Sequence, residues 1–264
     1  MGRFHRHDDG TVHAHEHGED EHSHHHDHAH EAGDHSGYDT GSQRVDVLEQ
    51  IFAENDIRAD VNRQAFETNG IRALNLMSSP GSGKTTVLGV TLDEFAGDIA
   101  VGVIEGDIAT DLDAAKLGGR GAQVSLLNTS NGFGGECHLD APMVNRALQG
   151  LDLSGLDLVI IENVGNLVCP AEFDVGEHAK AMVYSVTEGE DKPLKYPVMF
   201  RSVDVVLLNK IDLVPHLDVD VDTYIANVRQ VNPAATILPV SARTGAGMGA
   251  WFDWLRRFVG EAST

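Results

Sequence analysis

The sequence is short of basic side chains. Its 264 residues include 19 Lys and Arg against 41 Asp and Glu, a formal net charge of −22 at pH 7. Nucleic-acid backbones and anionic lipid surfaces repel such a chain, so neither is expected as its main partner. No run approaches the roughly 18 apolar residues of a membrane span, and the polar N-terminus does not resemble a secretory signal. Two cysteines exclude a disulfide scaffold. These absences predict a soluble, cytoplasmic protein.

Histidine is concentrated at one end of the chain. Twelve of the 15 histidines lie in the first 35 residues, and ten acidic residues lie in the first 40. Residues 1–42 have almost no apolar side chains, so burial cannot offset the entropy of ordering them, and we predict a disordered tail. Interleaved imidazoles and carboxylates favour binding of several Ni²⁺, Cu²⁺ or Zn²⁺ ions with modest selectivity. The ions should be released as the imidazoles protonate at about pH 6.5. The candidate tail ligands are His22, His24, His25, His26, His28 and His30. An engineered tag fits this segment poorly, because its longest histidine run is three residues.

The hydrophobic pattern changes after the tail. Residues 43–70 contain two patches of helical spacing, near 45–52 and 61–66, and are predicted to pack on the domain that follows. From 71 to 264, short apolar runs alternate with amphipathic stretches, which predicts one α/β domain with a doubly wound, mostly parallel sheet. The predicted strands lie near 74–78, 99–105, 123–127, 156–162, 181–186, 203–209 and 236–240. The predicted helices cover 84–95, 112–116, 141–148, 221–231 and 251–259.

A glycine-rich loop follows the first predicted strand. Residues 78–86 read SSPGSGKTT and open a helical pattern, which is the context of a Walker A loop in P-loop NTPases. The two glycines let backbone amides approach phosphate oxygens at a helix N-terminus. The lysine is predicted to lie along the β- and γ-phosphates, and the next threonine to ligate Mg²⁺. Ser78 stands where the motif usually has its first glycine. The candidate nucleotide-binding residues here are Pro80, Gly81, Ser82, Gly83, Lys84, Thr85 and Thr86.

Two later strands run into carboxylates. Asp107 follows residues 101–105, and Glu162 follows the apolar run at 158–161. Strand ends beside a phosphate loop are where Mg²⁺ or its waters need acceptors, although either acid could instead cap the next helix. Asp107 joins Lys84 as a candidate catalytic residue, through the orientation of Mg²⁺ and its waters. Gly165 is a candidate for the backbone amide that senses the γ-phosphate.

The nucleotide base is indicated by a later strand end. Asn209, Lys210 and Asp212 follow the apolar residues 203–208 and resemble the NKxD guanine motif of GTPases. The carboxylate would accept from guanine N1–H and the exocyclic amine, donors that adenine does not present in that pattern. The lysine is expected along the base plane, and the asparagine is expected to tie this loop to the phosphate loop. Ser241, Ala242 and Arg243 resemble the last base-contacting loop. GTP is therefore favoured over ATP.

The only two cysteines form a candidate metal site with one histidine. Cys137 precedes His138, and Cys169 lies seven residues after Glu162. Two thiolates and an imidazole suit tetrahedral Zn²⁺ or planar Ni²⁺, with the shell completed by water, an acid or a second subunit. Buried free thiols or a single disulfide are the alternatives. A metal at Cys169 would sense the nucleotide through the segment that contains Gly165.

Five stretches together resemble the HypB family of hydrogenase maturation GTPases, over residues from about 45 to 258. They are LMSSPGSGKTT at 76–86, VIEGD at 103–107, ECHLD at 136–140, ENVGNLVCP at 162–170 and TEGEDKPLKY at 187–196. The resemblance implies a GTPase of the SIMIBI class that dimerises with GTP and helps insert nickel into a [NiFe]-hydrogenase precursor, with the small nickel chaperone HypA as partner. It also implies a Ni²⁺ or Zn²⁺ site of Cys137, His138 and Cys169 at the dimer interface, and nickel storage by the His-rich N-terminus. Intrinsic turnover should be slow, since no arginine finger or catalytic glutamine is evident.

Two alternatives remain from the sequence. The urease accessory GTPase UreG shares the class and the metal, but its usual Cys-Pro-His motif is absent, since Ala171 follows Cys169 and Pro170. The other alternative is a nickel buffer in which the tail binds metal and the nucleotide domain is only a dimer switch.

Overall fold

The computed structural model describes residues 5–6, 12–13, 41–106, 117–127 and 138–263. The chain divides into two compact units, Met1–Gln43 and Arg44–Thr264. In the first unit, β1 (His5–Arg6) pairs antiparallel with β2 (Val12–His13). The six candidate histidine ligands of the tail lie outside the described residues, so the tail's disorder and metal binding stay predictions.

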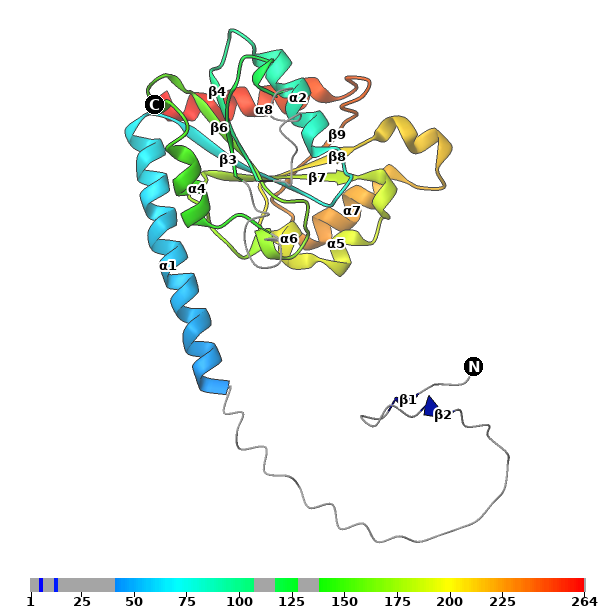
Figure 1. Ribbon diagram of the computed structural model, residues 1–264. Helices are drawn as coiled ribbons and strands as arrows, with labels where there is room; N and C mark the ends of the chain where they lie inside the picture. Colours follow the sequence, from blue (N-terminus) through cyan, green and yellow to red (C-terminus); the bar gives the residue numbers. More distant parts are fainter. Residues whose placement is uncertain (1–4, 7–11, 14–40, 107–116, 128–137, 264) are drawn as a thin grey trace, which may run out of the picture. The chain divides into compact units, whose positions relative to one another are not determined.

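The second unit is built on a seven-stranded sheet with the order β5-β4-β6-β3-β7-β8-β9 (Figure 1). All the strand pairs of this sheet are parallel. Its strands are β3 (Arg72–Ser78), β4 (Val101–Glu105), β5 (Gln123–Leu126), β6 (Leu158–Glu162), β7 (Ala179–Ser185), β8 (Val205–Asn209) and β9 (Thr236–Pro239). The order reverses beside the central strand β3, which confirms the doubly wound sheet and places ligands at its carboxyl edge.

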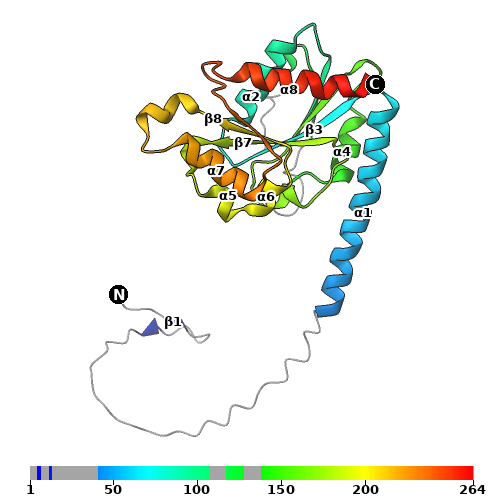
Figure 2. The same ribbon diagram turned by 180° about the vertical axis from the view of Figure 1, so that it is seen from behind.

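Helices cover both faces of the sheet, as Figures 1 and 2 show from opposite sides. One face packs on α2 (Lys84–Phe95) and α8 (Met248–Gly260), and the other on α1 (Gly41–Thr68), α4 (Ala141–Leu148), α6 (Pro197–Arg201) and α7 (Val221–Val231). Successive side chains of a strand point to opposite faces. Thus Leu74 and Leu76 join the α2 side of the core, whereas Ala73 and Met77 lie on the other side. Burial on both faces explains why inner strands such as β6 and β8 read as continuous apolar runs. The remaining helices are short: α5 (Lys192–Lys195), η2 (Leu153–Gly155), η3 (Cys169–Ala171), η4 (Val186–Glu188), η5 (Ile211–His216) and η6 (Glu261–Ser263).

The helical segment before the sheet differs from the sequence expectation. Instead of two patches, α1 is one continuous helix, because no glycine or proline interrupts residues 42–69. It ends where Gly70 adopts a φ of 69° and the N–H of Ile71 donates to the carbonyl of Phe66 at 2.9 Å. The sequence also missed α5 and α6, which are too short for a helical period to be visible. The predicted helix at 112–116 lies outside the described residues.

A pair of glycines before α8 allows a controlled test of backbone strain. Gly245 and Gly247 have φ values of 80° and 72°. A Cβ on Gly247 would lie 2.2 Å from the carbonyl oxygen of Pro239, whereas a Cβ on Gly245 would meet nothing within 4 Å. Gly245→Ala should therefore lower the free energy of unfolding only by the strain of the left-handed conformation, about 1–2 kcal/mol. Gly247→Ala should lower it further, because its Cβ also meets the Pro239 carbonyl. Urea unfolding of both variants measures the difference. Equal losses would show that the Pro239 carbonyl moves aside freely.

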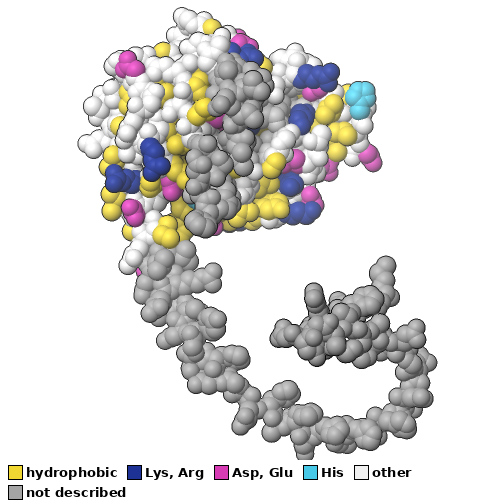
Figure 3. Space-filling view, viewed as in Figure 1, with side chains coloured by type: hydrophobic (Ala, Val, Ile, Leu, Met, Phe, Trp, Pro, Cys, Tyr) yellow, Lys and Arg dark blue, Asp and Glu magenta, His cyan; other side chains and the backbone are white. Residues whose placement is uncertain are grey.

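The described surface carries both signs of charge. On the face drawn in Figure 3, basic side chains lie close to acidic ones in several places. Ion pairs such as Arg256–Glu94 at 2.7 Å and Lys195–Asp191 at 2.6 Å are exposed and contribute little to stability. Within the described ranges, every helix is too short or too polar to cross a membrane.

Candidate functional site

The glycine-rich loop forms a cradle between β3 and α2. Gly81 and Gly83 have φ values of 74° and 99°, and a Cβ on Gly83 would lie 2.6 Å from Nδ2 of Asn209. Only glycine fits such a position. The hydroxyl of Ser82 donates to the carbonyl of Ser79 at 2.9 Å and closes the turn. A cavity of about 220 Å³ is lined by Ser78, Ser79, Pro80, Gly81, Gly83, Lys84, Thr85, Thr86 and Gly165. Its size and its position at the start of α2 suit phosphate groups.

Lys84 and Thr85 meet the carboxylate at the end of β6. The Lys84 ammonium lies 3.8 Å from Oε1 of Glu162, and both side chains are buried. The hydroxyl of Thr85 donates to the same oxygen at 2.8 Å. A hydroxyl and a carboxylate beside a phosphate cradle are hard oxygen donors, which fit Mg²⁺. Asp107, the other candidate for this role, lies outside the described residues.

Gly165 lies against the phosphate loop, although 81 residues separate it from Gly83 in the sequence. A Cβ at this position would be 3.3 Å from both Cα and N of Pro80, so glycine permits the close approach. It lines the same cavity as the loop. The structure therefore brings the segment that contains Gly165 to the wall of the phosphate-loop cavity.

A second cavity, of about 240 Å³, adjoins the loop and suits a purine base. Gly83, Thr86, Asn209, Lys210, Asp212, Leu213, Ser241, Ala242 and Arg243 line it. The amide of Asn209 donates to the carbonyl of Ser82 at 2.9 Å and accepts from the N–H of Ala242 at 3.1 Å, so one side chain joins three loops. The hydroxyl of Ser241 donates to Oδ1 of Asp212 at 2.7 Å, which fixes the plane of the carboxylate. The sequence assigned no role to Leu213, which has no signal beyond its position in the loop.

The backbone of Lys210 is held in an unusual conformation. Its φ of 64° is the only positive value among the non-glycine residues described, and such strain is typical of functional sites. The ammonium donates to the carbonyl of Gly81 at 2.6 Å, which leaves the aliphatic stem to line the base cavity. The geometry thus ties the loop that contains Asn209 and Lys210 to the phosphate loop at a second point.

Glu188 is a neighbour of the phosphate loop to which the sequence assigned no role. One carboxylate oxygen accepts from the hydroxyl of Ser79, and the other from the N–H of Ser185 at 2.9 Å. Burial raises the pKa of this carboxyl, against the lowering effect of the Ser79 hydrogen bond. In the sequence, the only indication of a role for Glu188 is its place in the stretch at 187–196, which resembles the HypB family.

The candidate metal ligands are only partly described. Cys137 lies outside the described residues, and Cys169 begins η3. The ring of His138 stacks on Phe173 at 4.1 Å between centroids, and Phe173 stacks on Phe52 of α1 at 5.3 Å. Within the part of the chain that the structure describes, no three His, Cys, Asp or Glu side chains form a cluster suited to a metal. Because Cys137 and the side chain of Cys169 lie outside that part, the three-ligand site stays a prediction.

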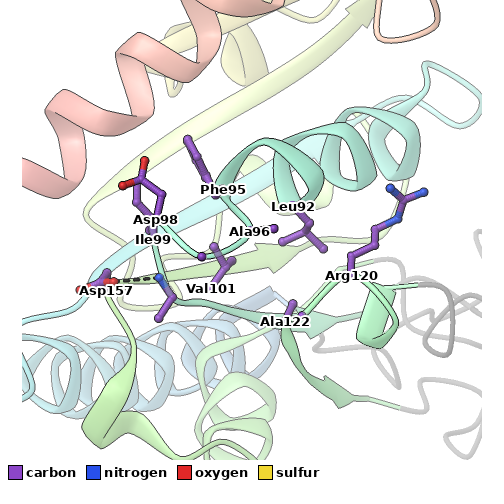
Figure 4. Close-up of a pocket in the computed structure, with 12 residues that line it drawn as sticks. Leu92, Phe95, Ala96, Asp98, Ile99, Val101, Arg120, Ala122 and Asp157 are labelled. Atoms are coloured by element: carbon purple, nitrogen blue, oxygen red, sulfur yellow. Dashed lines mark hydrogen bonds between the residues drawn. The ribbon is translucent and has the colours of Figure 1, made fainter.

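A third cavity, of about 390 Å³, lies at the opposite, amino edge of the sheet (Figure 4). The apolar side chains of Leu92, Phe95 and Val101 form its walls, and the N–H of Ala100 donates to Asp157 at 2.8 Å. It is larger than either cavity at the phosphate loop, but it has no glycine-rich cradle and no helix N-terminus. It therefore does not take part in the candidate nucleotide site.

The sheet, the cradle and the base cavity define the chain as a P-loop nucleotide-binding protein of the SIMIBI type. Residues 72–239 match the family described as CobW/HypB/UreG, nucleotide-binding domain. The chain belongs to the HypB family of hydrogenase maturation factors. It is 52% identical over 218 residues to the hydrogenase maturation factor HypB of Azotobacter chroococcum mcd 1, covering 82% of this chain and 70% of that protein. Identity to the Escherichia coli K12 hydrogenase maturation factor HypB is 46% over 225 residues, 85% of this chain and 76% of that protein.

Solved structures give the same result. HypB from Helicobacter pylori in complex with nickel is similar with a TM-score of 0.73 and 36% identity, over 79% of this chain and 96% of that one. The 54 kDa signal recognition particle protein from Aeropyrum pernix K1 in complex with GDP has a TM-score of 0.50 at 17% identity, over 73% of this chain and 47% of that one. The second likeness shows the fold alone. The family relationship favours the hydrogenase branch over the urease accessory alternative.

Proposed function

We propose that this chain is a GTP-hydrolysing nickel metallochaperone that delivers Ni²⁺ to, or gates its insertion into, a [NiFe]-hydrogenase precursor. The observation that carries the proposal is the joined pair of cavities, in which Asn209 and Lys210 fasten a base-binding loop to the phosphate loop. Family membership and the nickel complex of the Helicobacter pylori relative support the metal part. In this proposal the chain acts in the cytoplasm as a GTP-dependent homodimer, with HypA as its nickel-exchanging partner.

Hydrolysis would depend on charge placed around the terminal phosphate. Lys84 would bind the β- and γ-phosphates, while Thr85, Glu162 and Asp107 would hold Mg²⁺ and its waters. When bound, Mg²⁺ would neutralise the negative charge that develops on the phosphate oxygens. Gly165 would report the terminal phosphate through its backbone amide. Turnover should be slow without a partner, since the sequence offers no evident arginine finger.

The metal would be held by Cys137, His138 and Cys169, as Ni²⁺ in transit or as Zn²⁺. Two hydrogen bonds to Asn163 support coupling between the metal site and the nucleotide. The Lys84 ammonium donates to the backbone carbonyl of Asn163, and the side-chain oxygen of Asn163 accepts from the N–H of Leu139 at 3.0 Å. Leu139 is the neighbour of His138. A change at the phosphate loop would thus reach a metal ligand across two residues.

Titration of the full chain with Ni²⁺ tests the metal site without removing the tail. Because the only cysteines are Cys137 and Cys169, thiolate-to-nickel absorption in the near ultraviolet reports the proposed site alone. We expect the band to develop with saturation, to disappear in Cys137→Ala and Cys169→Ala, and to shift its midpoint with a non-hydrolysable GTP analogue. An allosteric coupling of ordinary size would shift the midpoint about 5- to 150-fold.

The matched control for this titration is the chain without residues 1–42. It should keep the thiolate band and lose the additional nickel equivalents bound by imidazoles. Absence of the band from the full chain would contradict the metal site. A band whose midpoint, stoichiometry and release rate ignore the nucleotide would contradict only the coupling.

Nickel storage is the second candidate function, and it is favoured by the twelve histidines in the first 35 residues. If the tail is a store, the chain without residues 1–42 matures hydrogenase at ample nickel and fails when nickel is scarce. If it is required for delivery itself, the deletion fails under both conditions.

A further inference from the structure

A buried polar network crosses the core beneath the phosphate loop. Asn75 lies in the middle of β3 and is fully buried, on the same side of the strand as Ala73. Its Oδ1 accepts from Nδ2 of Asn163 at 3.2 Å, and its own Nδ2 donates to Oε1 of Glu177 at 3.3 Å. An apolar side chain would be the ordinary choice in such a strand. Buried amides cost free energy unless they are satisfied, so a linked set of them indicates a specific role.

The upper end of the network holds the phosphate-binding lysine. The backbone carbonyl of Asn163 accepts from the Lys84 ammonium, and its Oδ1 accepts from the N–H of Leu139 at 3.0 Å and of Val164 at 2.9 Å. Phosphate oxygens in the cradle would compete with this carbonyl for the protons of the ammonium. Asn163 is therefore placed to respond when the cradle is occupied.

The lower end reaches the segment that helix α1 holds. Oε2 of Glu177 accepts from the N–H of Val175 at 2.7 Å. From α1, Asn55 donates to the carbonyl of Asp174 at 2.8 Å, and Asn62 donates to the carbonyl of Val175 at 3.0 Å. The backbone of Gly176 packs closely against the backbone of α1, since a Cβ on Gly176 would lie 2.6 Å from the carbonyl oxygen of Ala59.

A second branch ends on the same two side chains. Leu139, bonded to Asn163, leads within two residues to the first residue of α4. The N–H of Ala141 donates to Oδ1 of Asn55 at 2.9 Å, and its carbonyl accepts from Asn62 at 2.9 Å. Both asparagines are buried. Two separate paths from Asn163 thus converge on Asn55 and Asn62.

We propose that Asn75 and Asn163 are positioning residues that connect the Lys84 phosphate site to α1, so that nucleotide occupancy sets how firmly α1 is held. The inference rests on the proposed nucleotide site but not on the metal site. In this proposal α1 responds to the nucleotide, in addition to packing on the sheet.

Amide hydrogen exchange of the full chain, with and without a magnesium complex of a non-hydrolysable GTP analogue, tests this proposal. Wild-type peptides within residues 50–68 should differ between the two states by about 5-fold or more in exchange rate, the lower end of common allosteric couplings. Asn75→Leu keeps the number and branching of the side-chain heavy atoms and breaks the path through Glu177. It should bind the analogue and lose a large part of the difference, because only the path through Leu139 is left. A merely structural role would raise exchange equally in both states.

Two further variants keep the test decisive. The double variant Asn55→Ala with Asn62→Ala removes both side chains of α1 on which the paths end and does not alter the sheet, so it decides the question if Asn75→Leu does not fold. Asn232→Ala is the matched control, because Asn232 is a buried asparagine that holds the carbonyls of Phe200 and Val203 on the α6 side; it should keep the nucleotide response of α1.

Calorimetric binding of the analogue separates the possible failures. If wild type binds the analogue and α1 exchanges equally in both states, or if the double variant Asn55→Ala with Asn62→Ala keeps the wild-type difference, the connection is wrong while the nucleotide site stands. If wild type does not bind the analogue, the proposed function fails and the connection fails with it.

Discussion

Asp212→Asn is expected to lower the affinity for GTP by about 10²- to 10⁴-fold and to raise that for xanthosine triphosphate. The carboxylate would accept two hydrogen bonds from guanine, each worth about 1.5–3 kcal/mol because the acceptor is charged, and about 1.4 kcal/mol is a factor of ten. Xanthine has a carbonyl in place of the exocyclic amine, so an amide donor at residue 212 matches it. Ser241 already fixes the orientation of the side chain.

Competition against a fluorescent guanine nucleotide measures both affinities. The matched control is Asp218→Asn, an exposed carboxylate six residues along the chain, which should leave both affinities unchanged. If Asp212→Asn binds GTP as well as wild type does, the cavity beside Asn209 does not hold the base.

The sheet was predictable because its five inner strands, β4, β6, β3, β7 and β8, are buried on both faces. That burial produces apolar runs such as residues 158–161 and 203–208, and loops rich in Gly, Asp and Asn separate them. Helix α2 was predictable to its bounds, because the phosphate motif determines where it starts. The short α5 and α6 were not, since α6 is held by the burial of Met199 and Phe200 and has no helical period of its own.

The nucleotide site was partly predictable, because its residues follow strand ends and parallel strands bring those ends to one edge. Asn75 and Asn163 were not assigned roles, since a hydrogen bond between residues 88 positions apart has no local pattern. A polar residue within the apolar run of β3 was the one available signal for Asn75. The position of Phe173 between His138 and α1 likewise depends on tertiary packing.

Lys84→Met is expected to abolish measurable GTP hydrolysis and also to destabilise the folded protein. Loss of one preorganised charge at the terminal phosphate costs about 10²- to 10³-fold in rate. The side chains of Lys84 and Glu162 are 4% and 0% exposed, and their charged atoms are 3.8 Å apart. Removing one partner of a buried ion pair typically costs about 3–5 kcal/mol, because the other charge stays buried.

The double variant Lys84→Met with Glu162→Gln distinguishes these two losses. It removes both charges, so it should recover most of the lost stability in urea unfolding and recover no hydrolysis. Lys180→Met is the matched control: Lys180 lies 3.3 Å from the buried carboxylate of Glu177 at the opposite edge of the sheet, so it should lose stability and keep hydrolysis. If the double variant is as unstable as Lys84→Met, the lysine stabilises the fold through the carbonyl of Asn163 and not through the charge of Glu162. That result would move the energetic centre of the site from the carboxylate of Glu162 to the backbone of Asn163.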